Sequence, residues 1–341
     1  IIRLIVSQQI LKTGKLVGVR MTNKILICGA TGFMGRNILE SFKDSKYVVY
    51  ATGLSRDLEG FPRDRFFQVD LTSSEQVNAL FRDNEFDIVI QAAANTSGSK
   101  DITTKPYLHV TDNVIMNALI LQACYDNAVG HFIFLSCGVM YSPDRSPVKE
   151  EDFFLDEGIY PKYFGVGWTK VYVEKMCEFY SSLGRTKHTV VRHSNTYGPY
   201  DKYDLEKSHM FGATISKVMN EPDNGEIVVW GDGTGTERDL LYISDVTDFI
   251  HCALRQESDF GLYNVGYGKS FSVKNIVEKI IKSSGKNLKI TYDLSKPSIN
   301  TKLALNSDKA LRELGWKPKV SMEEGIDRTI KWYKENIEEK S

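Results

Sequence analysis

Three regularly spaced glycines near the start of the chain constrain its fold most strongly. Gly29, Gly32 and Gly35 follow the β-branched run Lys24–Cys28 and lead into the helical periodicity of Gly35–Phe42. Glycines at this spacing allow a tight turn and let the backbone approach a pyrophosphate, while the helix N-terminus supplies positive potential. In this strand–turn–helix context the spacing predicts a dinucleotide-binding site. A plain tight turn is the alternative.

Short β-branched runs alternate with helical periodicity from Met21 to about Ser142 and beyond. The pattern predicts strands at Lys24–Cys28, Tyr47–Thr52, Asp87–Gln91, His131–Ser136 and His188–Arg192. It predicts helices at Gly35–Phe42, Ser74–Asn84, Asn113–Asn127 and Val166–Leu183. This alternation is typical of an α/β fold, and we expect a Rossmann-type doubly wound parallel sheet with helices on both faces.

After Tyr197 the pattern loosens, and we expect a smaller C-terminal α/β substrate lobe. We place the dinucleotide-binding domain at 21–197 and the substrate lobe at 198–341, with a return to the first domain near 240–253. Further predicted elements are the strands Glu226–Trp230, Gly261–Val265 and Leu288–Tyr292, and the helices Ser272–Ser283, Ser307–Leu314 and Met322–Asn336. Residues 1–20 mix apolar and basic residues and are left as an unassigned N-terminal extension.

Composition narrows the class of partner. The formal net charge of −1 gives no electrostatic reason to expect nucleic acid or an anionic membrane. No apolar run reaches the length that spans a bilayer. The five cysteines are an odd number without a CxxC pair, which argues against a disulfide framework or a zinc site and favours a reducing cytoplasm. We therefore expect a cytoplasmic protein without a metal.

The segment after the second strand bears on which cofactor binds. In NAD users an acidic residue at this point takes the ribose hydroxyls, but here no acid occurs before Asp57. Ser55 and Arg56 suit a 2′-phosphate instead, so NADP is favoured and NAD stays possible. The alternative is that Arg56 is a solvated loop residue.

Several motifs, in order, carry a family resemblance. They are Gly29–Gly35, Ala92–Ala94, Ser194–Asp201, Lys207–His209, Trp230–Asp245 and Leu314–Trp316. From Met21 to Asn336 the chain resembles the extended short-chain dehydrogenases of the NAD-dependent epimerase/dehydratase family, and within them the GDP-L-fucose synthases. The resemblance implies a 3,5-epimerase and 4-reductase acting on a GDP-linked 4-keto-deoxy sugar, with a nicotinamide cofactor.

The cofactor contacts follow from the glycine motif and the resemblance together. Asp70 resembles the family's adenine-contacting aspartate, and the small residues Ala92–Ala94 end a strand where the nicotinamide half is expected. The full predicted set is Gly29, Thr31, Gly32, Phe33, Met34, Gly35, Ser55, Arg56, Asp70, Leu71, Ala92, Ala93, Ala94 and Lys170.

The residues that would perform the chemistry fit the family less well. Family members place a tyrosine four residues before a lysine, and the lysine lowers the pKa of the phenol that moves the carbonyl proton. Here Lys170 is present, but Val166 stands at the tyrosine position. Cys137 occupies the family's Ser/Thr position, and Val139 the position of the epimerisation cysteine. His209 falls on the epimerisation histidine.

Three candidates could supply the missing proton transfer. Tyr163 lies about one helical turn from the tyrosine position, and it could substitute, contact the substrate or belong to the core. The thiol of Cys137 could face the nicotinamide with a pKa depressed by Lys170, or it could be a buried hydrophobe. His209 is the expected proton-exchange residue, with a local helix cap as alternative. His193 and His131 are expected in the core or the crevice.

The resemblance also implies a set of sugar-nucleotide contacts. Arg238 resembles the arginine that clamps the pyrophosphate, a task that suits a guanidinium, and a surface ion pair with an adjacent carboxylate is the alternative. The predicted substrate-binding residues are Asn195, Asp201, Lys217, Trp230 and Arg238, with Tyr203 a further sugar contact.

Three functions remain open from the sequence. The first is a nicotinamide-dependent nucleotide-sugar epimerase/reductase. The second is an epimerase whose cofactor is not consumed. The third is a non-catalytic protein that binds a nucleotide sugar and a dinucleotide, since Val166 and Val139 remove two standard groups. By resemblance we expect a homodimer through Asn113–Asn127 and Val166–Leu183.

Overall fold

The computed structural model describes residues 24–96, 101, 104–143, 146–205, 208–296 and 301–339. The extension at residues 1–20 and Lys207 of the family motif lie outside these residues. Among the described residues, no helix is both long enough and apolar enough to cross a membrane.

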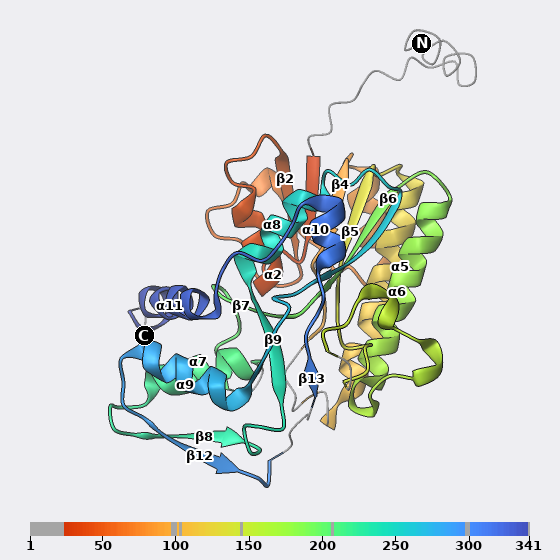
Figure 1. The fold of residues 1–341 in the computed structure, drawn as a ribbon. Helices are drawn as coiled ribbons and strands as arrows, with labels where there is room; N and C mark the ends of the chain where they lie inside the picture. The colour runs from red at the N-terminus through yellow and green to blue at the C-terminus, as the bar shows by residue number, and fades with distance from the viewer. Residues whose placement is uncertain are drawn as a thin grey trace, which may run out of the picture.

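A parallel sheet forms the larger lobe (Figure 1). Its described strands run in the order β10-β6-β5-β4-β1-β2-β3, and every neighbouring pair is parallel. Their bounds are β1 Lys24–Cys28, β2 Val48–Gly53, β3 Phe66–Gln68, β4 Ile88–Gln91, β5 His131–Cys137, β6 Lys187–His193 and β10 Phe260–Val265. The chain leaves β1 for β2 and β3, then returns to the other side of β1. The predicted doubly wound α/β fold is confirmed, and ligands bind such sheets at this reversal, beyond the carboxyl ends of the strands.

Helices cover both faces of the sheet, so its strands are apolar on both sides. Ile25 and Ile27 of β1 belong to one buried core, and Leu26 and Cys28 belong to the other. The first core includes α2 and α8, and the second includes α3, α5 and α6. Their bounds are α2 Phe33–Ser41, α3 Ser74–Arg82, α5 Thr111–Asp126, α6 Phe164–Ser182 and α8 Ile243–Ala253.

The second lobe is built around strand β9. This strand pairs with β11 antiparallel and with β7 and β13 in parallel, while β8 and β12 form a separate parallel pair. Figure 1 shows α7, α9 and α11 gathered beside the β8–β12 pair. The strands are β7 Asn195–Tyr197, β8 Glu226–Trp230, β9 Glu237–Tyr242, β11 Ser270–Ser272, β12 Lys289–Asp293 and β13 Lys302–Leu303. Its helices are α7 Met210–Asn220, α9 Val273–Ser284 and α11 Met322–Tyr333, whereas α10 Asp308–Leu314 packs against β10 of the larger sheet.

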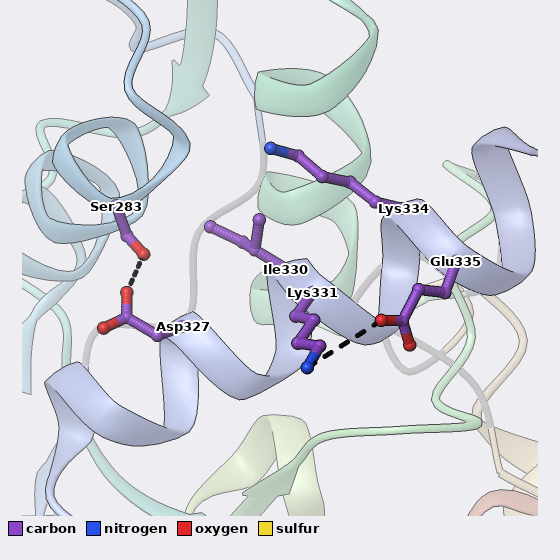
Figure 2. A pocket seen from close by; sticks show the side chains of 6 residues that line it. All are labelled: Ser283, Asp327, Ile330, Lys331, Lys334 and Glu335. Carbon is purple, nitrogen blue, oxygen red and sulfur yellow. Dashed lines mark hydrogen bonds and ion pairs between the residues drawn. The ribbon is translucent and has the colours of Figure 1, made fainter.

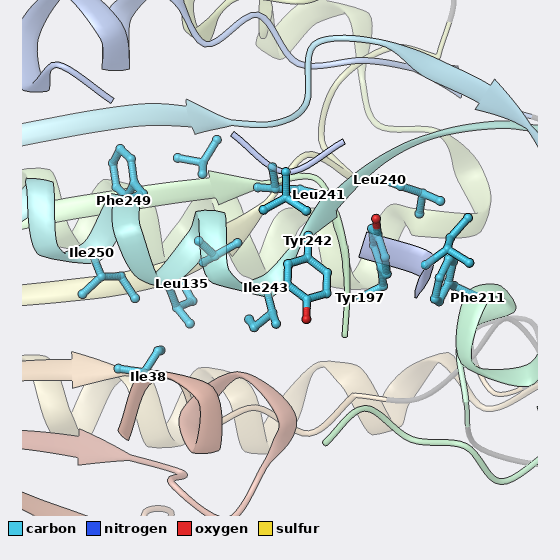
Figure 3. Close-up of a cluster of buried hydrophobic side chains, with 14 of the residues drawn as sticks. Ile38, Leu135, Tyr197, Phe211, Leu240, Leu241, Tyr242, Ile243, Phe249 and Ile250 are labelled. Atoms are coloured by element: carbon cyan, nitrogen blue, oxygen red, sulfur yellow. The ribbon is translucent and has the colours of Figure 1, made fainter. Parts of the chain in front are cut away.

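One core joins the two lobes. Figure 3 shows it running from Ile38 and Leu135, beside the sheet, to Tyr197 and Phe211 near the second lobe. Phe249 and Ile250 of α8 lie at the same end of this cluster as Ile38. Burial of such side chains is the main favourable term in folding, so this shared core fixes how the second lobe sits against the strand ends.

The structure adds two local features. Residues 237–242 form strand β9, which the sequence pattern did not predict, and Arg238 lies on it. The return to the large sheet extends past residue 253, because β10 pairs along its whole length with β6. The division at residue 197 stays a prediction.

Candidate active site

Two glycines of the turn are required by close packing, and the third leaves free space beside the helix. Gly29 has φ +73°, and a Cβ there would lie 2.6 Å from the Cα of Ala93. A Cβ on Gly35 would lie 2.2 Å from the carbonyl oxygen of Gly29. Both glycines are therefore required by the fold itself. Gly32, the N-cap residue of α2, is different, because its Cβ would meet only that same oxygen at 3.3 Å.

The space beside Gly32 fits a dinucleotide. Little protein occupies it, and the N-terminus of α2 offers backbone N–H groups and positive potential there. The predicted contacts Phe33 and Met34 are partly buried and pack against the core, so their backbone lines the turn. Ala93 also packs against this turn, and Ala94 is exposed beyond it.

The loops after β2 and β3 carry the residues predicted for the adenosine end of the cofactor. Gly53 lets the first loop lie close, since a Cβ there would be 2.8 Å from Thr31 Cγ2. Ser55 and Arg56 follow and are exposed. Asp70 accepts hydrogen bonds from the backbone and side chain of Thr72 at 2.9 and 2.7 Å, which lower the pKa of its carboxyl. The two loops thus carry opposite charges, a positive one on Arg56 and a negative one on Asp70. Their neighbour in the predicted set, Leu71, is buried.

Lys170 and Cys137 lie together at the end of β5. The Nζ of Lys170 donates to the carbonyl of Leu135 at 2.9 Å, and burial lowers its pKa against the opposing effects of Cys137 and Glu174. Burial raises the pKa of the Cys137 thiol more than Lys170 lowers it. The expected depression of that pKa is therefore wrong, and Cys137 is a protonated thiol at neutral pH.

Val166 stands at the position where the family resemblance predicts a tyrosine. Val166 is half-buried in the first turn of α6, one turn before Lys170. Tyr163 precedes the helix in a short 3₁₀ turn, so the argument from a shared helical face does not apply to it. Burial raises the pKa of Tyr163, while the charge of Arg238 lowers it and Cys137 raises it. Tyr163 is therefore close enough to Arg238 and Cys137 to be affected by their charges, although it lies outside the helix.

Val139 lies beyond the strand. β5 ends at Cys137, and residues 138–140 form a turn. Val139 therefore does not share a strand face with Cys137, because the alternation of side chains stops where the strand ends.

His209 is the N-cap residue of α7 and its side chain makes no capping bond. His209 as a residue is exposed. Desolvation by the protein around the imidazole is the largest cause that lowers its pKa to about 4, and the charges of Lys202 and His109 add to it. Its imidazole is neutral near pH 7. Burial raises the pKa of Asp201 to about 7, although its carboxylate accepts a hydrogen bond from the backbone of Lys202 at 2.7 Å. Tyr203 is buried and donates to a backbone carbonyl.

Arg238 and Asn195 meet on neighbouring strands. Arg238 donates to the carbonyl and hydroxyl of Thr301 at 3.0 and 2.7 Å, and burial lowers its pKa. Asn195 is exposed and donates to the carbonyl of Asp239 at 3.2 Å. The carboxylate of Asp239 is engaged by three backbone N–H groups, so it serves the loop rather than the guanidinium.

Two further predicted contacts lie farther along the second lobe. Lys217 of α7 donates to the carbonyl of Val228 at 2.8 Å. Trp230 ends β8, and its side chain is 40% exposed. An indole with that much free surface is suited to stack on a flat ring.

A buried ion pair behind the site was not predicted. Glu174 accepts from Arg192 at 3.1 and 2.7 Å and from Ser136 at 2.5 Å. Arg192 also donates to the Tyr141 hydroxyl at 2.7 Å, which in turn donates to Asn264. The network joins α6 to three strands and fixes the helix that carries Lys170. Two sequence features could have indicated this ion pair. One is a glutamate four residues after that lysine, and the other is an arginine inside an apolar strand.

His193 ends β6 directly opposite Cys137 in the strand register. Burial lowers the pKa of His193 to about 4, with smaller contributions from Lys170 and His209. His131, by contrast, is a core residue that bonds Thr189 at 2.8 Å. Of the two histidines expected in core or crevice, His193 is the one beside the predicted site.

Two surface recesses lie apart from these residues. One lies between α9 and α11, where Ser283 contacts Asp327 (Figure 2). The other borders the starts of α5 and α6 around Val110 and Gly165. Neither is lined by a predicted site residue. Within the described ranges, no three histidine, cysteine or acidic residues gather in a way that could hold a metal ion.

Fold and site together define a class of enzyme. A glycine turn opens a helix at the reversal of a doubly wound sheet, and Lys170 lies at the end of β5, where its charge and that of His209 act on His193. This is the arrangement of Rossmann-type nicotinamide-dependent epimerases and oxidoreductases. Residues 25–266 match the NAD dependent epimerase/dehydratase family, and the chain belongs to that family.

Relatives match over nearly the whole chain. A GDP-L-colitose synthase of Yersinia pseudotuberculosis is 28% identical over 91% of this chain and 97% of its own length. A GDP-L-fucose synthase of Sinorhizobium fredii is 28% identical over 92% and 96%. The crystal structure of a UDP-glucose 4-epimerase from Thermotoga maritima superposes with a TM-score of 0.82, at 24% identity over 92% of this chain and 99% of that one. The last likeness concerns the fold alone.

Proposed function

We propose that this chain is a nicotinamide-dependent epimerase/reductase that acts on a GDP-linked 4-keto-deoxy sugar. Two relatives of nearly equal length carry GDP-sugar synthase names. The observation that supports the proposal is the group of residues at the strand ends, where the charges of Lys170 and His209 act on His193. The charge of Arg238 acts on Tyr163 in the same region. A protein that only bound a nucleotide sugar would not need a neutral histidine beside the sugar position.

The glycine turn holds the dinucleotide in this proposal. Backbone N–H groups at Gly32 and the start of α2 bind the pyrophosphate, and Asp70 faces the adenosine half. The bound nicotinamide supplies hydride transfer to or from the sugar. Ser55 and Arg56 are exposed beside the ribose position, which favours NADP over NAD.

The second lobe holds the sugar nucleotide. Arg238, already oriented by Thr301, clamps the diphosphate with Asn195 at its side. Trp230 stacks on the base and Lys217 lies near it. The choice of GDP and of a 4-keto-deoxy sugar is supported by the names of the two relatives.

The chemistry divides into exchange and reduction. His209 is neutral near pH 7 and takes a proton from the carbon beside the keto group. Reduction at C4 also needs a proton donor, and Val166 removes the usual one. The protonated Tyr163 and Cys137 are the remaining donors at this site. Because of Val166, an epimerase that does not consume its cofactor is the second candidate function.

One incubation separates the candidates. Purified protein is mixed with GDP-4-keto-6-deoxymannose and NADPH in deuterated water, and the sugar is followed by NMR and the cofactor by absorbance. Deuterium at C3 or C5 supports epimerisation, and NADPH loss supports reduction. If neither change occurs over a long incubation, the proposal is contradicted, and binding of a nucleotide sugar is the remaining function. A His209→Ala variant is the control, since it should suppress exchange and still bind NADPH.

We also propose a homodimer in the cytoplasm. Large apolar side chains of α5 and α6 are exposed, among them Ile115, Tyr172 and Phe179 at 39%, 42% and 52%. Burying them against a second copy removes this apolar surface from water. Light scattering should give a dimer mass that Phe179→Glu reduces, and a parent monomer would contradict the proposal. All five cysteines are free, which suits a reducing compartment.

A further inference from the structure

We propose that His193 accepts the hydroxyl proton when a sugar hydroxyl is oxidised at this site, in place of the tyrosine that Val166 replaces. The inference rests on the proposed function and adds a proton-transferring residue to it. It is carried by the place of His193 in the sheet and by the hydrogen bond that orients its ring.

The sheet places His193 beside the hydride-transfer position. β5 and β6 are parallel, and Cys137 is the register partner of His193. Register partners on adjacent parallel strands point to the same face of a sheet. The preceding pair, Ser136 and Arg192, points to the opposite face, where both contact Glu174. His193 therefore flanks Cys137, at the strand ends where ligands of such sheets bind.

A single hydrogen bond fixes the tautomer of His193. Its Nδ1 lies 2.8 Å from the carbonyl oxygen of Ser194. A carbonyl only accepts, so Nδ1 carries the hydrogen, and in the neutral ring Nε2 is then an acceptor. The hydroxyl of Thr196 lies 3.3 Å from the same Nδ1 and also bonds the Ser194 carbonyl. The ring is thus oriented with its lone pair on Nε2.

Tyr163 and Cys137, the other two candidates for this proton transfer, cannot accept the proton. Burial keeps His193 neutral, and Lys170 and His209 act in the same direction. The phenol of Tyr163 and the thiol of Cys137 have raised pKa values and stay protonated. They can donate a proton, but only His193 among these three offers a free lone pair near pH 7.

The proposed step moves one proton and one hydride from the sugar. The O–H bond of the sugar C4 hydroxyl breaks, its proton moves to Nε2 of His193, and the carbonyl forms. The hydride from C4 passes to the oxidised nicotinamide.

The first measurement is the rate of GDP-L-fucose oxidation with NADP⁺, followed by absorbance of the reduced cofactor. His193→Gln should lower the rate by about 100-fold or more, as loss of a general base does, while cofactor affinity is kept. The control is His251→Gln, a half-buried histidine of α8 that bonds Ser41. Adding Val166→Tyr to His193→Gln should restore part of the rate. A His193→Gln rate equal to that of the parent, or an equal loss in His251→Gln, overturns the proposal.

The second measurement needs no turnover. Nitrogen-15 NMR of the protein without cofactor should show His193 neutral at pH 7, protonated on Nδ1 and bare on Nε2. A ring protonated on Nε2 overturns the proposal. If the parent neither oxidises the sugar nor exchanges its protons, the proposed function fails, and the tautomer still decides whether His193 can accept a proton.

Discussion

Separate replacement of Gly35 and Gly32 by alanine should have different effects. Gly35→Ala should lower the free energy of unfolding, and Gly32→Ala should weaken NADPH binding. A Cβ on Gly35 would lie 2.2 Å from the Gly29 carbonyl oxygen, so the backbone of the turn must shift. Overpacking of this kind costs about 1–3 kcal/mol, and a backbone contact this short lies toward the upper end. Alanine regains about 1 kcal/mol of helix propensity in α2, which leaves a net loss of about 2 kcal/mol.

Gly32→Ala should behave in the opposite way. Its methyl meets only one protein atom, at 3.3 Å, so the free energy of unfolding should stay close to that of the parent. The same methyl occupies the approach of the pyrophosphate and should weaken NADPH binding by about tenfold or more, ~1.4 kcal/mol. Urea unfolding and fluorescence titration of NADPH measure the two effects. A Gly32→Ala variant that binds like the parent, or a Gly35→Ala variant that is fully stable, would refute this account of the turn.

Three further outcomes are expected. Arg56→Ala should weaken NADPH by about 1.5–3 kcal/mol and leave NADH unchanged in parallel titrations; equal losses would mean that Arg56 does not contact a 2′-phosphate. Glu174→Gln leaves Arg192 buried without its charge partner and should cost about 3–5 kcal/mol in urea unfolding, whereas Glu324→Gln, in an exposed pair, should cost less than about 1 kcal/mol. Burial lowers the pKa of His131 to about 3, against ~6.5 unfolded, so the unfolded chain binds more protons between these values. Stability should fall as pH drops from about 6.5 toward 3, by up to ~1.4 kcal/mol per unit, and His131→Gln should flatten that slope.

The sequence was sufficient for the first lobe because its signals are local. The glycine spacing and the β-branched runs depend on neighbouring residues, so β1, the turn and α2 were predicted close to their observed bounds. Strand β9 was missed because its partners β7, β11 and β13 are distant in sequence and short. No local pattern encodes a pairing of that kind.

Candidate site residues could be named from the sequence, but their protonation states could not. Lys170, Cys137 and His209 could be named from motif positions, but their protonation depends on burial. The Cys137 thiol shows this, because burial outweighs the nearby lysine. His193 was noted only as a core or crevice histidine, since its relation to Cys137 exists only in the register of two strands.

The most direct test of the central claim is the rate of NADPH oxidation with GDP-4-keto-6-deoxymannose in the parent and in Val166→Tyr. Val166 lies one turn before Lys170 on α6, where a phenol would complete the missing pair. We predict a slow parent and a faster variant, with a gain of up to about 100- to 10,000-fold for restored acid–base assistance. A parent that already oxidises NADPH rapidly, and that Val166→Tyr slows, would contradict the account.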